Sequence, residues 1–204
     1  LDAYVRATLR YELRRLVKEL GLTAIHVTHD QEEAMSISDR LVIMKAGRIV
    51  EVGTPLDLYL SPKRLFTANF LGEANFLQGN VIECDSSQTV ASVNDWKIIF
   101  PGNGFAAGER VVLAIRPEWV MLSSTAGRSG QEWTGVVKEQ MLLGDIVRTG
   151  VELDNGVQIV AHAPNTGLDQ GIRVREPVRI DFSVGSVLSY RWPAEGLDVE
   201  LALE

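Results

Sequence analysis

The sequence has one cysteine, seven prolines and no long run of apolar residues. Crossing a bilayer takes about 18–20 consecutive apolar residues, so no membrane span is expected. The single Cys84 cannot form an internal disulfide, which fits a reducing compartment. No low-complexity tract is present, which argues against a mainly disordered or fibrous chain. With 204 residues, the chain is long enough for one large or two small domains.

Positive charge is also in short supply. The sequence has 20 Lys and Arg residues and 27 Asp and Glu residues, which gives a net charge of −7, and the acidic excess lies after residue 72. Contacts to nucleic-acid phosphates need a basic face. The composition therefore argues against a nucleic-acid partner, including an oligonucleotide bound to the second half.

The first 72 residues alternate helix and strand patterns. Spacings of three and four residues predict one helix that ends before Gly21; its apolar face consists of Val5, Leu9, Leu13, Leu16, Val17 and Leu20. The short apolar segment Thr23–Thr28 predicts a buried strand. Asp30 is placed to cap a second helix, with Glu32 and Glu33 in its first turn.

A hairpin and two short helices are expected next. Leu41–Lys45 and the strand that starts at Arg48 flank the tight turn Ala46-Gly47. Thr54-Pro55 and Ser61-Pro62 each place a hydroxyl before a proline, which predicts two helix starts, the second helix ending at Gly72. The pattern changes there, so we expect domains at 1–72 and 73–204.

Residues 73–204 read as short strands separated by turns, which is typical of small β-barrels. The predicted strands are Val81–Cys84, Thr89–Val93, Lys97–Phe100, Val111–Ile115, Trp119–Leu122, Thr134–Glu139, Val147–Leu153, Val157–His162, Val178–Phe182 and Val187–Tyr190. A weak internal repeat relates Gly79-Asn80-Val81 to Gly135-Val136-Val137, and the segment from Glu109 to the one from Glu176. We therefore expect two barrel-like half-units.

His29 is the side chain best placed for chemistry. It lies where the predicted strand hands over to the capped helix, and ligands gather outside the carboxyl ends of strands in α/β sheets. A neutral imidazole can donate from one nitrogen and accept on the other, so it could link a phosphate to an attacking water. A partly buried histidine that caps the strand end is the alternative.

Other candidate groups predict less. His26 and His29 form a His-x-x-His pair, but a zinc site needs three or four ligands. Cys84 and His162 lie in the other half of the chain, so no metal is expected. Glu32 and Glu33 diverge around the helix axis and do not form an acid–base pair. The sequence contains no Gly-rich phosphate loop and no nucleophile elbow, so the chain alone is expected to lack catalysis.

Several runs nevertheless resemble the end of an ABC transporter ATPase domain. They are Leu1-Asp2, Thr28-His29-Asp30-Gln31-Glu32-Glu33-Ala34-Met35, Asp39-Arg40, Met44-Lys45-Ala46-Gly47-Arg48-Ile49, Gly53-Thr54-Pro55 and Phe70-Leu71-Gly72. In the second half, Ile115-Arg116-Pro117-Glu118 resembles the appended regulatory domain, called TOBE, of importer ATPases for sugars, polyamines, iron or sulfate. The resemblance implies an α/β C-terminal fragment of a P-loop ATPase domain, followed by an all-β, OB-like TOBE double barrel.

The resemblance also implies roles for individual residues. His29 matches the switch histidine that contacts the γ-phosphate of ATP, and Asp2 matches the last residue of the D-loop at the interface between two ATPase subunits. ATP and Mg²⁺ are then expected in an intact parent protein, and neither is expected on this fragment alone. Arg116, Pro117 and Glu118 are a weaker candidate, since a strand-ending turn set by the proline explains them as well.

The function implied is that of an energy-coupling ATPase subunit of an importer. It would form a homodimer with a second ATPase subunit, work with transmembrane permease subunits and, indirectly, a solute-binding protein, and lie in the cytoplasm on the inner face of the membrane. The alternative is a non-catalytic OB-like module that binds a small oxyanion, a sugar or a regulatory protein. Wide separation in sequence favours packing over a stacking platform for the tryptophans, which are Trp96, Trp119, Trp133 and Trp192.

Overall fold

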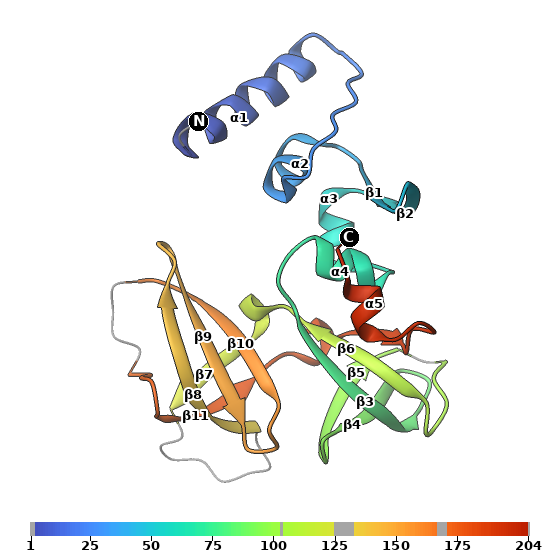
Figure 1. The fold of residues 1–204 in the computed structure, drawn as a ribbon, viewed down its shortest axis with the longest axis vertical. Coiled ribbons are helices and arrows are strands. Elements are labelled where there is room, and N and C mark those ends of the chain that lie inside the picture. The colour runs from blue at the N-terminus through green and yellow to red at the C-terminus, as the bar shows by residue number, and fades with distance from the viewer. Residues whose placement is uncertain (1–2, 103, 125–132, 167–170, 204) are drawn as a thin grey trace. The chain divides into compact units, whose positions relative to one another are not determined.

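The computed structural model describes residues 3–102, 104–124, 133–166 and 171–203. The chain divides into two compact units, Leu1–Gly72 with Glu195–Glu204, and Glu73–Ala194 (Figure 1). The expected second domain, 73–204, differs from this division in its last ten residues, which group with the first unit. Among the described residues, no helix combines the length and the apolar character that a bilayer crossing requires.

The two predicted helices at the start of the first unit are confirmed. Helix α1 spans Ala3–Glu19 and ends in a Schellman-type motif, because the N–H of Leu22 donates to the Val17 carbonyl at 3.0 Å and Gly21 adopts a φ of +62°. Helix α2 spans Gln31–Ile37, and the side chain of Asp30 accepts the N–H of Glu33 at 2.9 Å. Local capping signals therefore set both boundaries.

The predicted strand Thr23–Thr28 is wrong. These residues have no strand assignment, and the side chains of Ile25 and Val27 are 94% and 90% exposed. A strand needs a neighbour to take its backbone hydrogen bonds and a layer to cover its side chains. The described residues pair no strand with this segment, so its apolar pattern is left without a sheet.

The rest of the first unit packs around a hairpin. Strands β1 (Leu41–Lys45) and β2 (Arg48–Gly53) are joined by Ala46-Gly47, both at positive φ, as a tight hairpin turn requires. Helix α3 (Pro55–Leu60) is capped by Thr54 as predicted. The small hydrophobic core of the first unit consists of Leu41, Ile43, Leu58, Phe66 and Leu71.

Two details of this unit differ from the sequence expectation. Helix α4 spans Leu65–Phe70, and its N-cap is Arg64, without a side-chain cap bond, rather than Ser61. The short helix α5 (Leu197–Leu201) comes from the C-terminal end of the chain. The ammonium of Lys45 donates to the carbonyls of Val199 and Glu200 at 3.1 and 3.2 Å, which ties α5 to the hairpin.

The second unit is all-β, as predicted. Its strands form two five-stranded antiparallel sheets in the orders β12-β6-β3-β4-β5 and β10-β9-β8-β11-β7 (Figure 1). The strands are β3 Asn75–Cys84, β4 Gln88–Val93, β5 Trp96–Pro101, β6 Arg110–Ile115, β7 Met121–Ser124, β8 Trp133–Leu142, β9 Ile146–Leu153, β10 Gln158–Pro164, β11 Pro177–Asp181 and β12 Leu188–Arg191. The predicted strand Trp119–Leu122 is wrong at its start, because a 3₁₀ turn, η1, covers Pro117–Trp119.

The internal repeat is confirmed by the strand register. The β3–β4 ladder shifts between Val81 and Glu83, and the β8–β9 ladder shifts between Val137 and Glu139. At each shift the chain makes the same extra bond: the N–H of Val81 donates to the Glu109 carbonyl at 2.9 Å, and that of Val137 donates to the Glu176 carbonyl at 3.1 Å. The two half-units are therefore built on one plan, each with a bulge at the same place.

The two half-units exchange their last strands. After β6 the chain passes through η1 into β7, which pairs with β11 of the second sheet. After β11 it passes through a second 3₁₀ turn, η2 (Val184–Ser186), into β12, which pairs with β6 of the first sheet. Side chains from both sheets consequently share one hydrophobic core.

Two glycines mark equivalent close approaches in this unit. A Cβ on Gly79 would lie 2.9 Å from the Ser92 carbonyl oxygen, and one on Gly135 would lie 2.5 Å from the Glu152 carbonyl oxygen. Both contacts are with backbone of the neighbouring strand, which cannot swing aside. The start of each half-unit thus requires a residue without a side chain.

We predict that Gly135→Ala and Gly79→Ala each lower the free energy of unfolding, by about 1–3 kcal/mol, with Gly135→Ala the more damaging. Gly185→Ala is the matched control, because a Cβ there meets nothing closer than 3.8 Å. It should change stability by less than about 1 kcal/mol. Denaturant unfolding measures all three variants, and equal effects at Gly135 and Gly185 would contradict the close approach.

Candidate functional site

His29 lies in the turn that leads into α2, and its side chain is exposed. Thr28 accepts the N–H of Asp30 through its hydroxyl at 3.0 Å, and Asp30 accepts the N–H of Glu33 at 2.9 Å. Hydrogen bonds therefore hold the residues on both sides of His29, whose side chain is exposed. The alternative of a partly buried histidine at a strand end is wrong, since no strand forms and the ring is exposed.

Ion pairs hold this turn against the first helix. The guanidinium of Arg10 lies 2.7 Å from the Asp30 carboxylate and 3.1 Å from that of Glu32. The backbone N–H of Glu33, together with Arg10, holds the pKa of Asp30 below its usual value. Lys18 of α1 also reaches Asp39 beyond the end of α2, at 2.7 Å. The start of α2 is thus a fixed, polar feature of the first unit.

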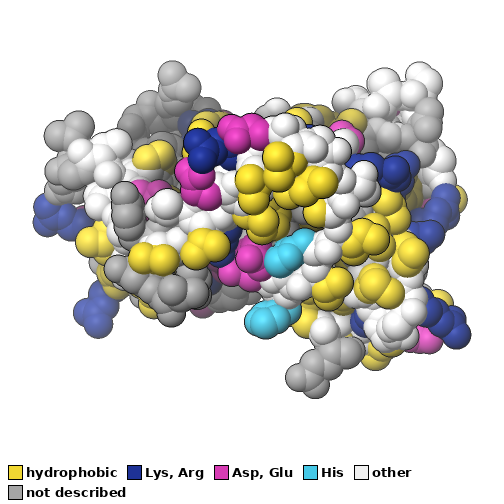
Figure 2. Space-filling view, turned by 90° about the horizontal axis from the view of Figure 1, so that it is seen from above, with side chains coloured by type: hydrophobic (Ala, Val, Ile, Leu, Met, Phe, Trp, Pro, Cys, Tyr) yellow, Lys and Arg dark blue, Asp and Glu magenta, His cyan; other side chains and the backbone are white. Residues whose placement is uncertain are grey.

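The other candidate residues of the first unit do not form a site with His29 among the residues that the structure describes. The Nε2 atom of His26 lies 3.2 Å from the Glu33 carboxylate. Nowhere in the described ranges do three or more His, Cys, Asp or Glu side chains gather as a metal-binding group. The face seen from above carries histidine side chains beside exposed hydrophobic ones (Figure 2). Asp2, the other predicted interface residue, lies outside the described residues.

These residues fit only part of a nucleotide site. His29 can offer one hydrogen bond to a phosphate oxygen from a fixed turn. The sequence contains no Gly-x-x-x-x-Gly-Lys run, so a lysine and a backbone cradle for the phosphates are not among its residues. The sequence therefore offers an exposed histidine at this turn but no phosphate-binding loop of the Gly-x-x-x-x-Gly-Lys type.

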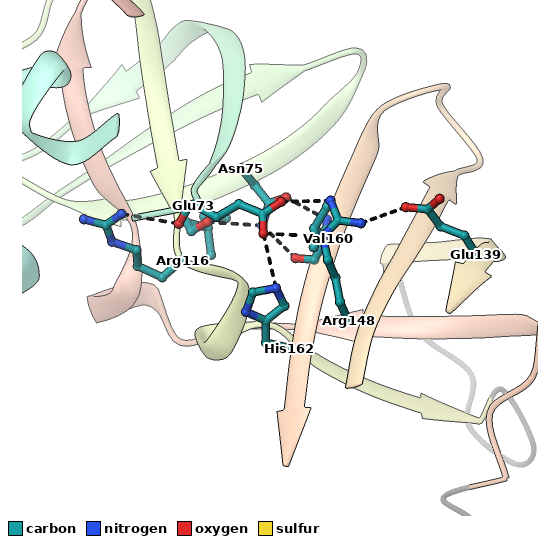
Figure 3. Close-up of polar contacts among 8 residues, drawn as sticks. Glu73, Asn75, Arg116, Glu139, Arg148, Val160 and His162 are labelled. Carbon is teal, nitrogen blue, oxygen red and sulfur yellow. Dashed lines mark hydrogen bonds and ion pairs between the residues drawn. The ribbon is translucent and has the colours of Figure 1, made fainter. Parts of the chain in front are cut away.

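The Arg116-Pro117-Glu118 run forms the strand-ending turn that its proline predicts, because β6 ends at Ile115 and η1 begins at Pro117. Arg116 is fully buried, and its Nη1 atom donates to the Glu73 carbonyl at 3.3 Å (Figure 3). Pro117 begins η1, and the N–H of Trp119 donates to the Arg116 carbonyl at 3.0 Å. Arg116 therefore holds the first residue of the second unit to the turn between β6 and β7.

A polar cluster surrounds Glu73 (Figure 3). Arg148 of β9 lies 2.8 Å from the Glu73 carboxylate and 2.7 Å from that of Glu139, while the Nε2 atom of His162 lies 3.2 Å from Glu73. Arg148 is the main cause that holds the pKa of Glu73 below its usual value; burial opposes this effect. No local sequence pattern predicts this cluster, because its members come from distant parts of the chain.

Asn75 adds a second tie at the same place. Its side chain accepts the N–H of Val160 at 2.7 Å and donates to the Val160 carbonyl at 2.8 Å. The amide thus pairs with a β10 backbone in the way that another strand would. Together with the Glu73 cluster, it joins the beginning of β3 to the second sheet.

A half-open cavity of about 550 Å³ lies next to this cluster. Its walls come from η1, β7, β8, β9, β10 and the segment that follows β10; they comprise Glu118, Val120, Met121, Leu122, Gln140, Val147, Thr149, Ala161, His162, Ala163, Pro164, Asn165, Thr166 and Ile172. Glu118 is the only member of the predicted Arg116-Pro117-Glu118 site that reaches it. Sequence reasoning missed the cavity, because no local motif marks it.

The tryptophans are packing residues that partly cluster. Trp96 and Trp133 lie with ring centroids 4.9 Å apart, and Trp133 meets Phe182 edge-on at 5.1 Å. All three side chains are partly buried against the shared core. Trp192 lies under the guanidinium of Arg110, 3.6 Å from its ring centroid. The expected packing role is borne out for Trp96, Trp119 and Trp133, which all pack against the shared core, although Trp96 and Trp133 are neighbours rather than scattered.

Comparison with known proteins first gives the class. Residues 113–188 match the TOBE domain, so the all-β unit with its paired sheets contains this domain. The expected all-β, OB-like TOBE domain is thereby confirmed over that range.

The relatives then give the kind of protein. The spermidine/putrescine import ATP-binding protein PotA of Pseudomonas fluorescens is 35% identical over 181 residues, 88% of this chain and 50% of that protein. PotA of Aliivibrio fischeri is 34% identical over 100% of this chain and 53% of its own length. The Fe(3+) ions import ATP-binding protein FbpC of Brucella abortus is 35% identical, covering 89% of this chain and 50% of the relative. The resemblance to ATP-binding proteins of ABC importers is confirmed, and the chain spans about half the length of these relatives.

We predict that Glu73→Gln lowers stability at neutral pH and removes part of its acid dependence. A carboxylate whose folded pKa is lowered stabilises above its unfolded pKa, and this stability is lost as the pH falls through the folded value. Because Glu73 is partly exposed, the effect at pH 7 should stay below about 1 kcal/mol.

Unfolding curves at pH 7 and at several values below about 4.5 measure this difference. The gap between the wild type and Glu73→Gln should shrink as the pH falls. Glu83→Gln, at an exposed position of β3, is the control and should leave the profile unchanged. A gap that stays constant or widens in acid would show that Arg148 does not stabilise ionised Glu73.

Proposed function

We propose that this chain is part of an ATP-hydrolysing, energy-coupling subunit of an ABC importer, and that His29 contacts the γ-phosphate of ATP. The observation that carries the proposal is the similarity to importer ATP-binding proteins along 88% to 100% of the chain. The exposed, fixed position of His29 supports it.

The segment Thr23–Thr28, which has the sequence of a strand but forms none in this structure, supports the same proposal. Thr23–Thr28 is short and rich in β-branched residues, and both Ile25 and Val27 are almost fully exposed. Such a segment suits a parallel sheet that is covered on both faces. An ATPase domain built on a parallel sheet would give it strand neighbours and would place His29 at the carboxyl end of that sheet, where ligands bind.

The proposed chemistry needs little of His29 beyond position. Phosphoryl transfer depends on placing the attacking water and neutralising charge on the phosphate. Bound Mg²⁺ would supply part of that neutralisation. A neutral imidazole held by the Thr28–Asp30 turn donates one hydrogen bond to a terminal phosphate oxygen and leaves its other nitrogen to orient water. Without the phosphate loop, residues 1–204 alone should not hydrolyse ATP.

The partners follow from the proposed class. Two such subunits would close around ATP, pass that motion to transmembrane permease subunits and serve a solute-binding protein indirectly at the inner face of the membrane. The solute is a separate matter. Relatives of nearly equal identity are named for spermidine and putrescine and for Fe(3+) ions, so the similarity favours neither.

We predict that His29→Ala lowers ATP turnover by about 100-fold or more while ATP binding persists, because the substitution removes a positioning contact and leaves the binding loop intact. The experiment uses the complete reading frame that encodes these residues, with turnover and nucleotide affinity measured separately. His26→Ala, which removes the neighbouring imidazole, is the matched control and should stay within about twofold.

Two results would overturn the proposal. Near-normal turnover in His29→Ala would remove the role of that residue. A complete reading frame without a Gly-x-x-x-x-Gly-Lys-Ser/Thr loop would remove the ATPase itself.

A further inference from the structure

Each half-unit has an end that lies beyond its bulge, here called its mouth. The two mouths can be compared residue by residue along the strand pairs. One row across β3, β4 and β5 consists of Cys84, Thr89 and Phe100. The row at the same distance from the bulge in the second half-unit consists of Gln140, Thr149 and Ala161. The central threonine is buried in both rows. The outer strand of the row therefore carries Phe100 in the first half-unit, on β5, and Ala161 in the second, on β10.

The first mouth is filled by its own aromatic side chains. Phe100 is fully buried, and Phe105, from the loop after β5, packs edge-on against it with ring centroids 5.8 Å apart. Both rings contact the shared core. Two of the chain's own rings therefore fill the first mouth.

The second mouth lacks these rings. Ala161 stands at the position of Phe100, and Ile172, in the loop after β10, stands 67 residues after Phe105, the offset that also separates Glu109 from Glu176. The half-open cavity of about 550 Å³ lies here and includes both residues in its lining. An apolar cavity of about 150 Å³ is large enough to hold benzene in an engineered protein. The missing ring thus leaves room for a ring-sized ligand.

The lining selects the chemistry of that ligand. Most of the wall is apolar, including Met121 and Leu122 of β7 and Val147 of β9. Hydrogen-bonding groups are present as well: Gln140 and Thr149, whose side chains lie 3.4 Å apart, and His162. Among the lining residues that the structure describes, Glu118 carries a carboxylate, and none is a lysine or an arginine. The site therefore favours a neutral or cationic molecule over an anion.

We propose that the mouth of the second half-unit binds a small aromatic molecule that carries one hydrogen-bonding substituent and is neutral or cationic. Its ring takes the place that Phe100 occupies in the first half-unit, and its substituent meets Gln140, Thr149 or His162. Pockets in the mouths of β-barrels, apolar with a few convergent polar groups, are common ligand sites. This site does not depend on the proposed ATPase function, since it lies wholly within residues 73–194.

The test is a titration of the 204-residue chain with three ring-sized probes, followed by protein-detected NMR. The probes are p-cresol, which is neutral, tyramine, which is cationic, and 4-methylbenzoate, which is anionic. We expect saturable binding of p-cresol and tyramine at millimolar concentration or below, with shifts on β7, β9 and β10. The benzoate should bind at least about tenfold more weakly, because Glu118 repels it.

Substitutions in the two mouths give opposite expected results. Ala161→Phe, which copies the first mouth, should weaken p-cresol binding at least about tenfold, and Ala163→Phe should do the same from the rim of the cavity. Phe100→Ala should create a second binding site for p-cresol. Ala106→Phe, at an exposed loop position, is the control and should leave binding unchanged.

The proposal fails if neither p-cresol nor tyramine binds at millimolar concentration. It also fails if binding survives in folded Ala161→Phe or Ala163→Phe, since the probe then lies elsewhere. Equal or tighter binding of 4-methylbenzoate would overturn the stated charge preference. Ala163→Phe changes only a half-buried rim position, so it keeps the test decisive if Ala161→Phe does not fold.

Discussion

The exchange of β7 and β12 between two half-units of one plan is the constraint on which the second unit depends. Each half-unit completes its sheet with a strand that follows the other half's ladder in sequence. Neither sheet can therefore bury its inner face without the other, and the core that results is shared. The bulges and the close approaches at Gly79 and Gly135 repeat in both halves, which keeps the two ladders in the same register.

The two half-units share one plan but differ at their mouths. Both mouths contain a buried threonine, but they differ on the neighbouring outer strand. Phe100 of β5 fills the first mouth, whereas Ala161 of β10 leaves the second open. Beside the open mouth, Arg148 and His162 meet Glu73, and Arg116 holds the Glu73 carbonyl. The polar cluster thus fixes the strands that form the cavity wall, while the exchanged β7 contributes its apolar side. The first unit contributes something different, a polar turn that presents His29.

Sequence reasoning predicted those features that local patterns encode. Alternation placed nearly all the strands of the second unit, and caps at Asp30 and Thr54 placed two helices. It failed where partners outside the segment decide the outcome: Thr23–Thr28 forms no strand without neighbours, and Trp119 enters a 3₁₀ turn after Pro117. His29 could be proposed from the sequence because it lies in a continuous motif. The cavity and the Glu73 cluster come from distant strands, so no local pattern announces them.

Native-state hydrogen exchange over residues 73–194 tests the shared fold most directly. If the exchanged strands make one cooperative unit, amides at the centres of β3 and of β8 should converge on the same free energy of opening as denaturant is added. They should do so although they belong to different sheets. Convergence on two distinct values, with one sheet still protected while the other exchanges, would contradict a single unit held together by β7 and β12.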